Sequence, residues 1–258
     1  MIQLEKKYID ILIDLKQNYN ASALKFEFET EYFSLSELQK MKEIAELVKL
    51  DLNVKISGCS SIRDLRDSKI LGADAIIVPM IESAYSLEKF IKTLDIVYSK
   101  DEQKNLKLYI NIETEMGLKN LSQIVDSSYF NYIDGVVFGR NDMAASFGFS
   151  KNKINSSEFV KIGNDIACEI SKKEKKLFIG GMVTEESLKY FVDIEATNFV
   201  KFETRKVVFN FDKNSKIDYV TAINKALEFE MLLLDNKQNK YDEDISRIKM
   251  LKKERIPS

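Results

Sequence analysis

The stretch from Leu106 to Gly148, LKLYINIETEMGLKNLSQIVDSSYFNYIDGVVFGRNDMAASFG, contains two short strand patterns with a helical pattern between them. Residues 106–113 alternate strictly between apolar and polar side chains, which is the period of a strand with one buried face. Residues 132–139 form a short apolar run, as a buried parallel strand does. Because residues 115–124 have a helical pattern, the stretch predicts a strand–helix–strand unit of a parallel sheet.

An acidic residue lies at or just after the end of each of these two strands, Glu113 in the first case and Asp142 in the second. In a parallel α/β barrel the C-terminal ends of the strands meet at one face and carry the functional side chains. Mg²⁺ and Mn²⁺ prefer oxygen ligands, and Mg²⁺ in particular takes only one or two carboxylates from protein. We therefore interpret Glu113 and Asp142 as ligands of a divalent metal. The alternative is that Glu113 caps the following helix and Asp142 forms a turn.

Strand and helix patterns alternate in the same way along the rest of the chain, which is typical of a parallel α/β fold. Strands are predicted at residues 23–29, 51–57, 74–81, 106–113, 132–139, 176–182 and 198–205. An eighth strand is either 207–211 or a short segment near the N-terminus, and the pattern favours neither. We predict a TIM-type (β/α)8 barrel over residues 23–212.

Helical patterns flank the predicted barrel. Residues 1–20 are expected to form a helix that covers one end of the barrel, and residues 213–258 a helical extension, so that 1–258 make up a single domain. Beyond Asn236 the extension is charged and carries a thin apolar stripe of Ile245, Ile248 and Leu251, which is too narrow to bury alone. This tail either docks on the barrel or on a neighbouring subunit, or stays solvated and partly frayed.

The second face of the predicted strands is charged or polar rather than apolar. It carries Lys25, Glu27, Glu29, Lys55, Asn111, Glu113, Lys201, Glu203 and Arg205. A purely structural barrel fills its interior with branched aliphatic side chains, and an unpaired buried charge costs on the order of several kcal/mol. We interpret this face as the lining of a pocket for an anionic substrate. The alternative is an internal salt-bridge network with strand ends exposed at the rim.

Composition limits the classes of function. The 258 residues include 39 basic and 41 acidic side chains, for a net charge of −2, so no electrostatic case exists for nucleic acid or an acidic membrane. The N-terminus lacks the apolar core of a secretory signal, and no apolar run is long enough to span a bilayer. Cys59 and Cys168 lie far apart and form no ligand motif. These features predict a reduced, cytoplasmic setting.

The chain contains no histidine. This absence excludes histidine general bases, Ser–His triads and His-ligated zinc. Any catalysis must therefore use carboxylates, lysine, arginine, tyrosine, a thiol or bound water.

Four motifs carry a family resemblance. They are Val78-Pro79-Met80-Ile81-Glu82, Asn111-Ile112-Glu113, Asn120-Leu121 with Ile124, and Gly139-Arg140-Asn141-Asp142-Met143 with Phe147-Gly148. Over residues 23–212 the chain resembles the HpcH/HpaI aldolase and citrate lyase beta-subunit family of metal-dependent 2-oxo-acid aldolases and lyases. The resemblance implies that Glu113 and Asp142 bind Mg²⁺ or Mn²⁺. It also implies a homo-oligomer, a trimer or hexamer.

The chain departs from the family pattern at two points. Several aldolases of the family use a histidine base near the metal water, so this chain stands closer to the citrate lyase branch. Lys55 occupies the strand on which the family places a substrate-binding arginine, and it offers a point charge instead of a bidentate fork. Arg140 and Arg205 are further candidates for binding the substrate's anionic group, with Asn111 beside them.

Three functions are compatible with these residues. The first is a carbon–carbon lyase that cleaves a 2-oxo or 2-hydroxy acid, or an acyl thioester as some relatives do, through a Mg-stabilised enolate. Its proton carrier would be Glu27, Glu29 or metal-bound water, with Lys55 beside the substrate. The second is an aldolase that forms a Schiff base on Lys55 or Lys201. The third is a non-catalytic barrel that serves in binding or assembly.

Overall fold

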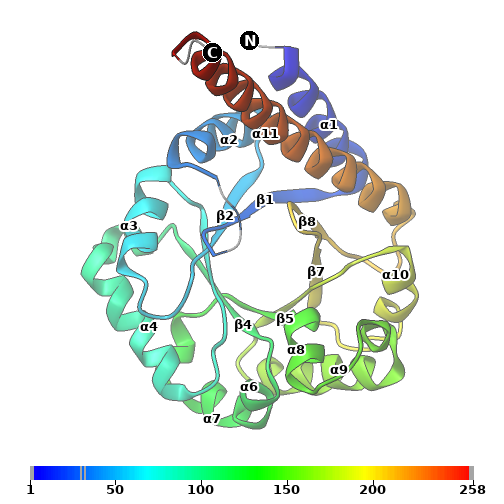
Figure 1. Ribbon diagram of the computed structural model, residues 1–258. Coiled ribbons are helices and arrows are strands. Elements are labelled where there is room, and N and C mark those ends of the chain that lie inside the picture. Colours follow the sequence, from blue (N-terminus) through cyan, green and yellow to red (C-terminus); the bar gives the residue numbers. More distant parts are fainter. Residues whose placement is uncertain (1–2, 30, 32, 256–258) are drawn as a thin grey trace.

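The computed structural model describes residues 3–29, 31 and 33–255, with side chains for 4–29, 31, 33–150 and 153–237. Eight strands form a closed barrel in the order β1 to β8, with the helices arranged around it (Figure 1). The strands are β1 (Ala21–Glu27), β2 (Asp51–Lys55), β3 (Ala75–Val78), β4 (Lys107–Ile112), β5 (Gly135–Gly139), β6 (Lys176–Gly180), β7 (Phe199–Glu203) and β8 (Val207–Asn210). The predicted TIM-like α/β barrel is confirmed, and the eighth strand is the one near residues 207–211.

The last strand runs against its neighbours. Strands β1 to β7 pair in parallel around the barrel, whereas β8 is antiparallel to both β7 and β1. Between β7 and β8 lie only Thr204, Arg205 and Lys206. A parallel connection needs a crossover of about a dozen residues, so this short link permits only a hairpin. Thr204 closes the turn, because its N–H donates to Val207 O at 2.9 Å.

Helices follow most of the strands and form the outer layer. They are α1 (Gln3–Tyr19), α2 (Leu35–Val48), α3 (Ile62–Leu71), α4 (Ala84–Val97), α5 (Lys100–Gln103), α6 (Glu115–Lys119), α7 (Leu121–Asp126), α8 (Arg140–Ser146), α9 (Ser157–Ser171), α10 (Glu185–Phe191) and α11 (Tyr219–Arg255), with 3₁₀ turns at Ser128–Tyr132 and Lys151–Asn155. The helix predicted at 115–124 is divided at Asn120 into α6 and α7.

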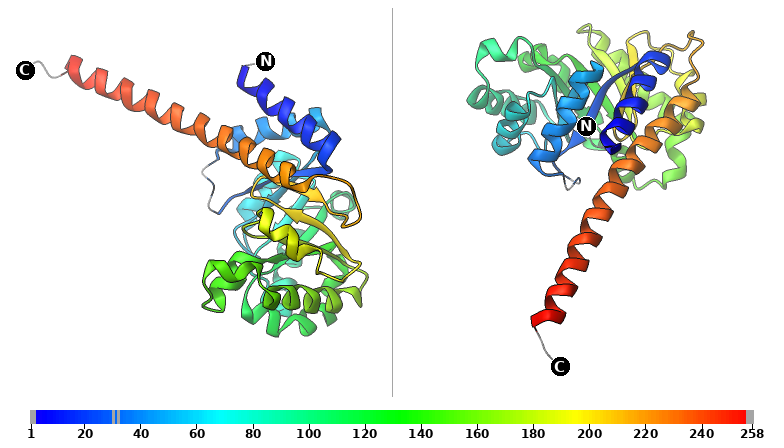
Figure 2. Two further views of the ribbon diagram at one scale, coloured as in Figure 1. Left: turned by 90° about the vertical axis from the view of Figure 1, so that its right-hand side faces the viewer. Right: turned by 90° about the horizontal axis from the view of Figure 1, so that it is seen from above.

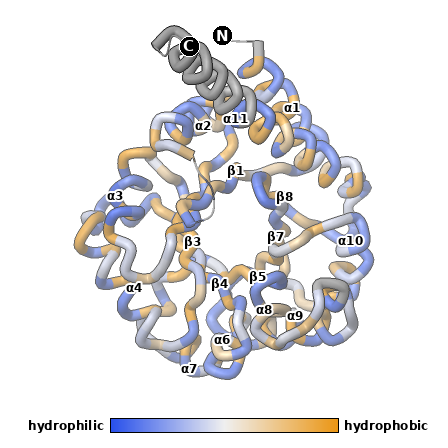
Figure 3. The backbone as a smooth tube through the Cα atoms, in the orientation of Figure 1, coloured by the Kyte–Doolittle hydropathy of each residue, from blue (hydrophilic) through white to orange (hydrophobic). Residues whose placement is uncertain are grey.

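The strands bury one apolar face against the helices. Leu24 and Phe26 of β1 belong to this outer core, and hydrophobic and hydrophilic positions alternate along the surrounding helices (Figure 3). A second, smaller cluster lies inside the barrel and consists of Ala75, Ile77, Tyr109, Val137 and Phe178. The interior therefore combines an apolar layer with the charged side chains that the alternation predicts.

The two terminal helices pack against one another beside β1. The ring of Tyr8 on α1 meets that of Phe229 on α11 edge to face at 5.6 Å, and the Tyr8 hydroxyl donates to Leu232 O at 3.2 Å. Helix α11 then continues well beyond the barrel (Figure 2). The apolar stripe predicted at Ile245, Ile248 and Leu251 lies outside the side chains that the structure describes. Within the described residues, no helix combines the length and apolar character needed to cross a bilayer.

An aromatic cluster holds the β7–β8 hairpin against the helices. Phe202 stacks on Phe209 at 5.0 Å and also contacts Phe211 and Tyr219 at 6.0 and 5.5 Å between ring centroids. Both Phe202 and Phe209 are completely buried. Because β8 is only four residues long, much of its attachment depends on these rings.

We predict that Phe202→Ala destabilises the protein by about 3–5 kcal/mol, because it removes a large side chain from the centre of this cluster. Urea denaturation followed by circular dichroism measures the change. The matched control is Leu227→Ala, since Leu227 is 47% exposed on α11 and its truncation should cost less than about 0.5 kcal/mol. A loss below about 1 kcal/mol for Phe202→Ala would show that the hairpin does not depend on the cluster.

Candidate active site at the carboxyl ends of the strands

A small cavity lies at the C-terminal ends of β1 to β7, the face on which parallel barrels place their functional side chains. Its volume is about 110 Å³. It is lined by Lys25, Glu27, Lys55, Ile77, Asn111, Glu113, Val137, Gly139, Asn141, Asp142, Gly180, Gly181 and Glu203. Each of the seven parallel strands, or the loop that follows it, contributes at least one residue. The closed sheet therefore brings together groups that are far apart in the sequence.

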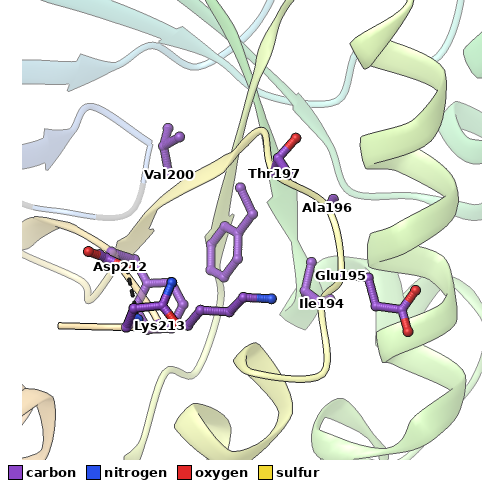
Figure 4. A pocket seen from close by; sticks show the side chains of 10 residues that line it. Ile194, Glu195, Ala196, Thr197, Val200, Asp212 and Lys213 are labelled. Atoms are coloured by element: carbon purple, nitrogen blue, oxygen red, sulfur yellow. Dashed lines mark hydrogen bonds between the residues drawn. The ribbon is translucent and has the colours of Figure 1, made fainter.

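A larger cavity, of about 290 Å³, lies at the opposite end of the barrel, between the α10–β7 loop and the segment after β8 (Figure 4). Phe199 and Phe211 form its apolar wall. Its acidic side chains do not converge, because Glu195 and Asp212 lie on opposite sides of it (Figure 4). Chemistry needs several polar groups aimed at one point, so we assign the candidate site to the smaller cavity.

Glu113 is held deep in this cavity, with 2% of its surface exposed. Its Oε1 accepts from the backbone N–H of Met80 at 3.0 Å and its Oε2 accepts from Asn111 Nδ2 at 2.9 Å. Met80 has a φ of +52°, which is uncommon for a residue other than glycine and turns its N–H toward the carboxylate. The helix cap is Thr114, whose Oγ1 accepts from Gly117 N at 3.0 Å. Glu113 is therefore not the capping residue.

Gly139 makes room for the Glu113 side chain. A Cβ atom at this position would lie 2.5 Å from Glu113 Oε2 and 2.6 Å from Glu113 Cβ, closer than non-bonded atoms can approach. Gly180 stands in a similar relation to Glu203, with a virtual Cβ 3.3 Å from Glu203 Oε2. Glycine on β5 and on β6 thus leaves space for the carboxylates of β4 and β7.

Asp142 lies half-buried in the first turn of α8 and faces the same cavity as Glu113. Burial raises the pKa of the Glu113 carboxyl, and the charge of Asp142 adds to this rise, while Lys55, Asn111 and the Met80 N–H oppose it. The two carboxylates are therefore close enough to repel one another. Such repulsion is relieved when a cation lies between them.

The lining residues fit a divalent metal in charge and in ligand type. Two lysines and four acidic side chains line the cavity, which therefore has a formal excess of two negative charges. Asn111 adds a neutral oxygen, Oδ1, which is buried and has no hydrogen-bond partner among the described residues. In the part of the chain that the structure describes, no group of three or more Asp, Glu or Cys side chains forms a metal cluster. A metal here would have two carboxylates and keep waters, as Mg²⁺ does.

Lys55 lines the cavity with Glu113 and Asp142 and interacts with the charge of each. Burial by itself would lower the pKa of Lys55, but the charges of Glu113, Glu27, Glu29 and Asp142 raise it above the ordinary value. Lys55 therefore stays protonated at neutral pH. A protonated amine can attract an anionic substrate but cannot attack a carbonyl carbon.

Lys201 also points into the barrel but does not line the cavity. Its Nζ lies 5.4 Å from the centre of the Phe178 ring. Burial lowers the pKa of Lys201, and the charges of Asp51 and Glu203 partly oppose this effect. Lys201 precedes Glu203 by two residues on β7 and so lies one inward-facing position before the cavity wall.

Lys25 on β1 and Glu203 on β7 form an ion pair, at 2.6 Å between Nζ and Oε2. These strands are the two neighbours of β8, the strand that closes the barrel. Both side chains line the cavity, although the sequence placed them only in the polar interior. The signals that could have identified them are their inward direction on β1 and β7 and the glycine at position 180 beside Glu203.

The remaining acidic candidates lie at or near the rim. Glu27 lines the cavity, and its Oε1 is 3.8 Å from Arg205 Nη2. Glu29 is about half exposed, lies 3.9 Å from Lys55 and does not line the cavity. Arg205 also contacts Glu31 and Glu230, at 3.3 and 3.7 Å. Its charge is thus matched by three carboxylates, so the prediction that Arg205 binds the substrate anion is not supported.

Arg140 does not line the cavity, and its contacts give no support to the prediction that it binds substrate. Arg140 is 3% exposed and donates to Gly180 O at 3.2 Å and to Gly181 O at 2.8 Å. It also donates to Asn155 Oδ1 at 3.0 Å and stacks over the Phe191 ring. Burial lowers the pKa of Arg140 to about 9, which still leaves it charged at neutral pH. Arg140 joins the loops that follow β5 and β6.

Comparison with protein families gives one match. A family model described as HpcH/HpaI aldolase/citrate lyase matches residues 38–194. This range is more than half of the chain and includes both Glu113 and Asp142. No curated protein sequence matches the chain.

Several solved structures share the fold. Citrate synthase SbnG is 15% identical with a TM-score of 0.61, and the match covers 90% of each chain. The HpcH/HpaI aldolase from Desulfitobacterium hafniense DCB-2 is 12% identical with a TM-score of 0.58, over 76% of this chain and 82% of the other. An HpcH/HpaI aldolase/citrate lyase family protein from Burkholderia cenocepacia J2315 is 10% identical with a TM-score of 0.59, over the same shares. At these identities the likeness establishes the fold alone.

We predict that Glu113→Gln stabilises the metal-free protein at pH 7 by about 2 °C in Tm, roughly 0.5–1 kcal/mol for a chain of this length. The folded protein raises the pKa of Glu113 above 4.5, so it favours the uncharged side chain. That contribution is fully present in the wild type below pH 4.5 and is lost as the pH rises through the raised pKa. The Tm difference between variant and wild type should therefore grow from pH 4.5 to pH 7.

Thermal unfolding in EDTA across this pH range measures the effect. Glu228→Gln is the matched control, because Glu228 is exposed on α11 and its neutralisation should give no pH-dependent difference. A Glu113→Gln protein that is less stable than the wild type at pH 7 would contradict the raised pKa.

Proposed function

The chain belongs to the HpcH/HpaI aldolase/citrate lyase family, and from this premise we propose that it is a carbon–carbon lyase. Its substrate would be a small 2-oxo or 2-hydroxy acid. The proposal rests mainly on the convergence of Glu113 and Asp142 on one small cavity that carries an excess of negative charge. A barrel kept only for assembly has no need of buried carboxylates that repel one another.

Glu113 and Asp142 would hold Mg²⁺ or Mn²⁺, and Asn111 offers a further oxygen. When bound, the metal would supply a Lewis acid that stabilises the negative charge of an enolate during carbon–carbon cleavage. The Met80 N–H and Asn111 Nδ2 keep the Glu113 carboxylate in one orientation. This fixed orientation reduces the cost of ordering the site when ligand binds.

Lys55 would attract the carboxylate of the substrate. Its ammonium group lies among carboxylates that keep it protonated, and a point charge can accommodate anions of several shapes. Ile77 and Val137 supply the apolar part of the wall. The cavity of about 110 Å³ suits an acid of a few carbon atoms, so the carrier portion of any acyl thioester would remain outside it.

The Schiff-base alternative has less support. Lys55 is protonated by its surroundings, and Lys201 lies away from the cavity. The non-catalytic alternative predicts indifference to metal and to 2-oxo acids, and the first experiment below distinguishes it.

We also propose the cytoplasm as the setting and a homo-oligomer as the assembly. The two cysteines, Cys59 and Cys168, are free thiols, which suits a reducing compartment. The projection of α11 beyond the barrel (Figure 2) provides a helix on which a neighbouring subunit could pack.

We predict that Mg²⁺ or Mn²⁺ raises the Tm of the wild type by about 5 °C or more at a concentration well above Kd. The same metals should have little effect on Asp142→Asn, because one of the two anionic ligands is lost. Thermal shift with and without EDTA, combined with cleavage assays, measures both. Asp165→Asn is the control, since Asp165 is exposed on α9. A wild type indifferent to metals, pyruvate and oxaloacetate would favour the non-catalytic barrel.

We predict that borohydride reduction in the presence of pyruvate traps no adduct on Lys55 or Lys201. The physical reason is that Lys55 is protonated and Lys201 does not line the cavity. Peptide mass spectrometry after reduction tests this. An adduct on either lysine, absent when pyruvate is omitted, would establish the Schiff-base mechanism instead.

A further inference from the structure

One buried carboxylate oxygen in the cavity has no role in the site described so far. Glu203 on β7 is 2% exposed and lines the cavity. Its Oε2 accepts from Lys25 Nζ at 2.6 Å, whereas its Oε1 has no hydrogen-bond partner among the described residues. A buried polar atom without a partner costs about 1–3 kcal/mol, so an acceptor kept in this state points to a ligand that donates to it.

The other acidic side chains of the cavity are engaged differently. Both oxygens of Glu113 accept hydrogen bonds from the protein. Glu27 lies beside Arg205 at the rim, and Asp142 is only half-buried in the first turn of α8. Glu29, the further candidate, is about half exposed and lies outside the cavity. Glu203 therefore combines burial, a position on the cavity wall and an oxygen without a hydrogen-bond partner among the described residues.

The surroundings of Glu203 fix its direction. Gly180 on the neighbouring strand leaves room for the carboxylate, since a Cβ atom there would lie 3.3 Å from Oε2. Lys25 binds Oε2 from strand β1, and the Lys25 backbone N–H donates to Lys206 O at 2.8 Å. The ion pair therefore holds Oε2 and leaves Oε1 without a hydrogen-bond partner on a side chain that lines the cavity.

We propose that Glu203 is the proton carrier of the cleavage reaction, a role for which the sequence offered Glu27, Glu29 or water. This inference rests on the proposed lyase function. It also accounts for how a chain without histidine could move a proton inside the cavity, since a carboxylate positioned within hydrogen-bond reach is an effective general base.

The proton balance is complete for a 2-oxo acid that carries a hydroxyl group on C4, the arrangement that a retro-aldol cleavage requires. Oε1 of Glu203 takes the C4 hydroxyl proton, and the freed electron pair forms the carbonyl of an aldehyde or ketone. The C3–C4 bond breaks, and its electron pair enters the enolate of the 2-oxo acid. Protonated Glu203 then returns the proton to C3, which releases the shorter 2-oxo acid and regenerates the carboxylate.

Exchange of the pyruvate methyl protons in D₂O tests this role without knowledge of the full substrate, because exchange needs only removal and return of a C3 proton. Proton NMR with Mg²⁺ present gives the rate. We expect Glu203→Gln to slow exchange at least about 100-fold, while the Mg²⁺-induced rise in Tm stays as in the wild type. The retained rise shows that the metal ligands are intact, so a merely structural role would not give this pair of results.

Glu31→Gln is the matched control, since Glu31 also forms a buried ion pair, with Lys206, but does not line the cavity. It should leave exchange within about threefold of the wild type. Glu27→Gln tests the competing carboxylate. Loss of exchange in Glu27→Gln together with normal exchange in Glu203→Gln would assign the role to Glu27 and overturn the proposal.

The lyase function and the role of Glu203 fail in different ways. A wild type that neither exchanges pyruvate protons nor cleaves 4-hydroxy-2-oxo acids overturns both. A wild type that exchanges them, with Glu203→Gln equally active, overturns only the role of Glu203. If Glu203→Gln does not fold, Lys25→Met combined with Glu203→Gln replaces the ion pair by two neutral side chains. A folded double variant that still exchanges at the wild-type rate would overturn the proposal, and one that responds to Mg²⁺ without exchange would support it.

Discussion

Two acidic side chains fit inside this barrel because the strands beside them carry glycine. At Gly139 any side chain would collide with the Glu113 carboxylate, and at Gly180 it would press on Glu203. Space alone would not keep the charges there, since buried ions need partners. The Met80 N–H and Asn111 bind Glu113, and Lys25 binds Glu203. The chemistry proposed for the cavity depends on this combination of a missing side chain and a fixed donor.

Because the chain contains no histidine, the titratable groups of the cavity are lysines and carboxylates. Lysines and carboxylates line the same cavity, and Lys55 and Glu113 act on each other's pKa. Lys55 illustrates the balance, because burial and the neighbouring carboxylates act on its pKa in opposite directions and the carboxylates prevail. A metal with two positive charges would offset the remaining excess of negative charge. In the proposed function, the same network would serve cation binding and anion recognition without an imidazole.

The sequence predicted the barrel well because the alternation of apolar and polar residues along each strand indicates which face of the sheet each side chain occupies. Glu113 and Asp142 were selected from their positions at strand ends, and both line the cavity. The inward direction of Lys25 and Glu203 followed from strand alternation. The pairing of those two residues was not predictable, since β1 and β7 come close together only because β8 lies between them and closes the barrel. The contacts of Arg140 were not predictable, because a sequence reveals a charge but not where a long side chain reaches, here to the carbonyls of Gly180 and Gly181.

The reversed last strand has a consequence for synthesis on the ribosome. Strand β1 has only β2 as a neighbour until β8, which is among the last segments of the barrel to be translated, pairs with its other edge. Folding during synthesis can therefore form an open, curved sheet but cannot close the barrel before β8 is made. Lys25 likewise has no ion-pair partner in the cavity until Glu203 has been translated. The nascent chain carries an unsatisfied sheet edge for most of its elongation, a state in which aggregation competes with folding.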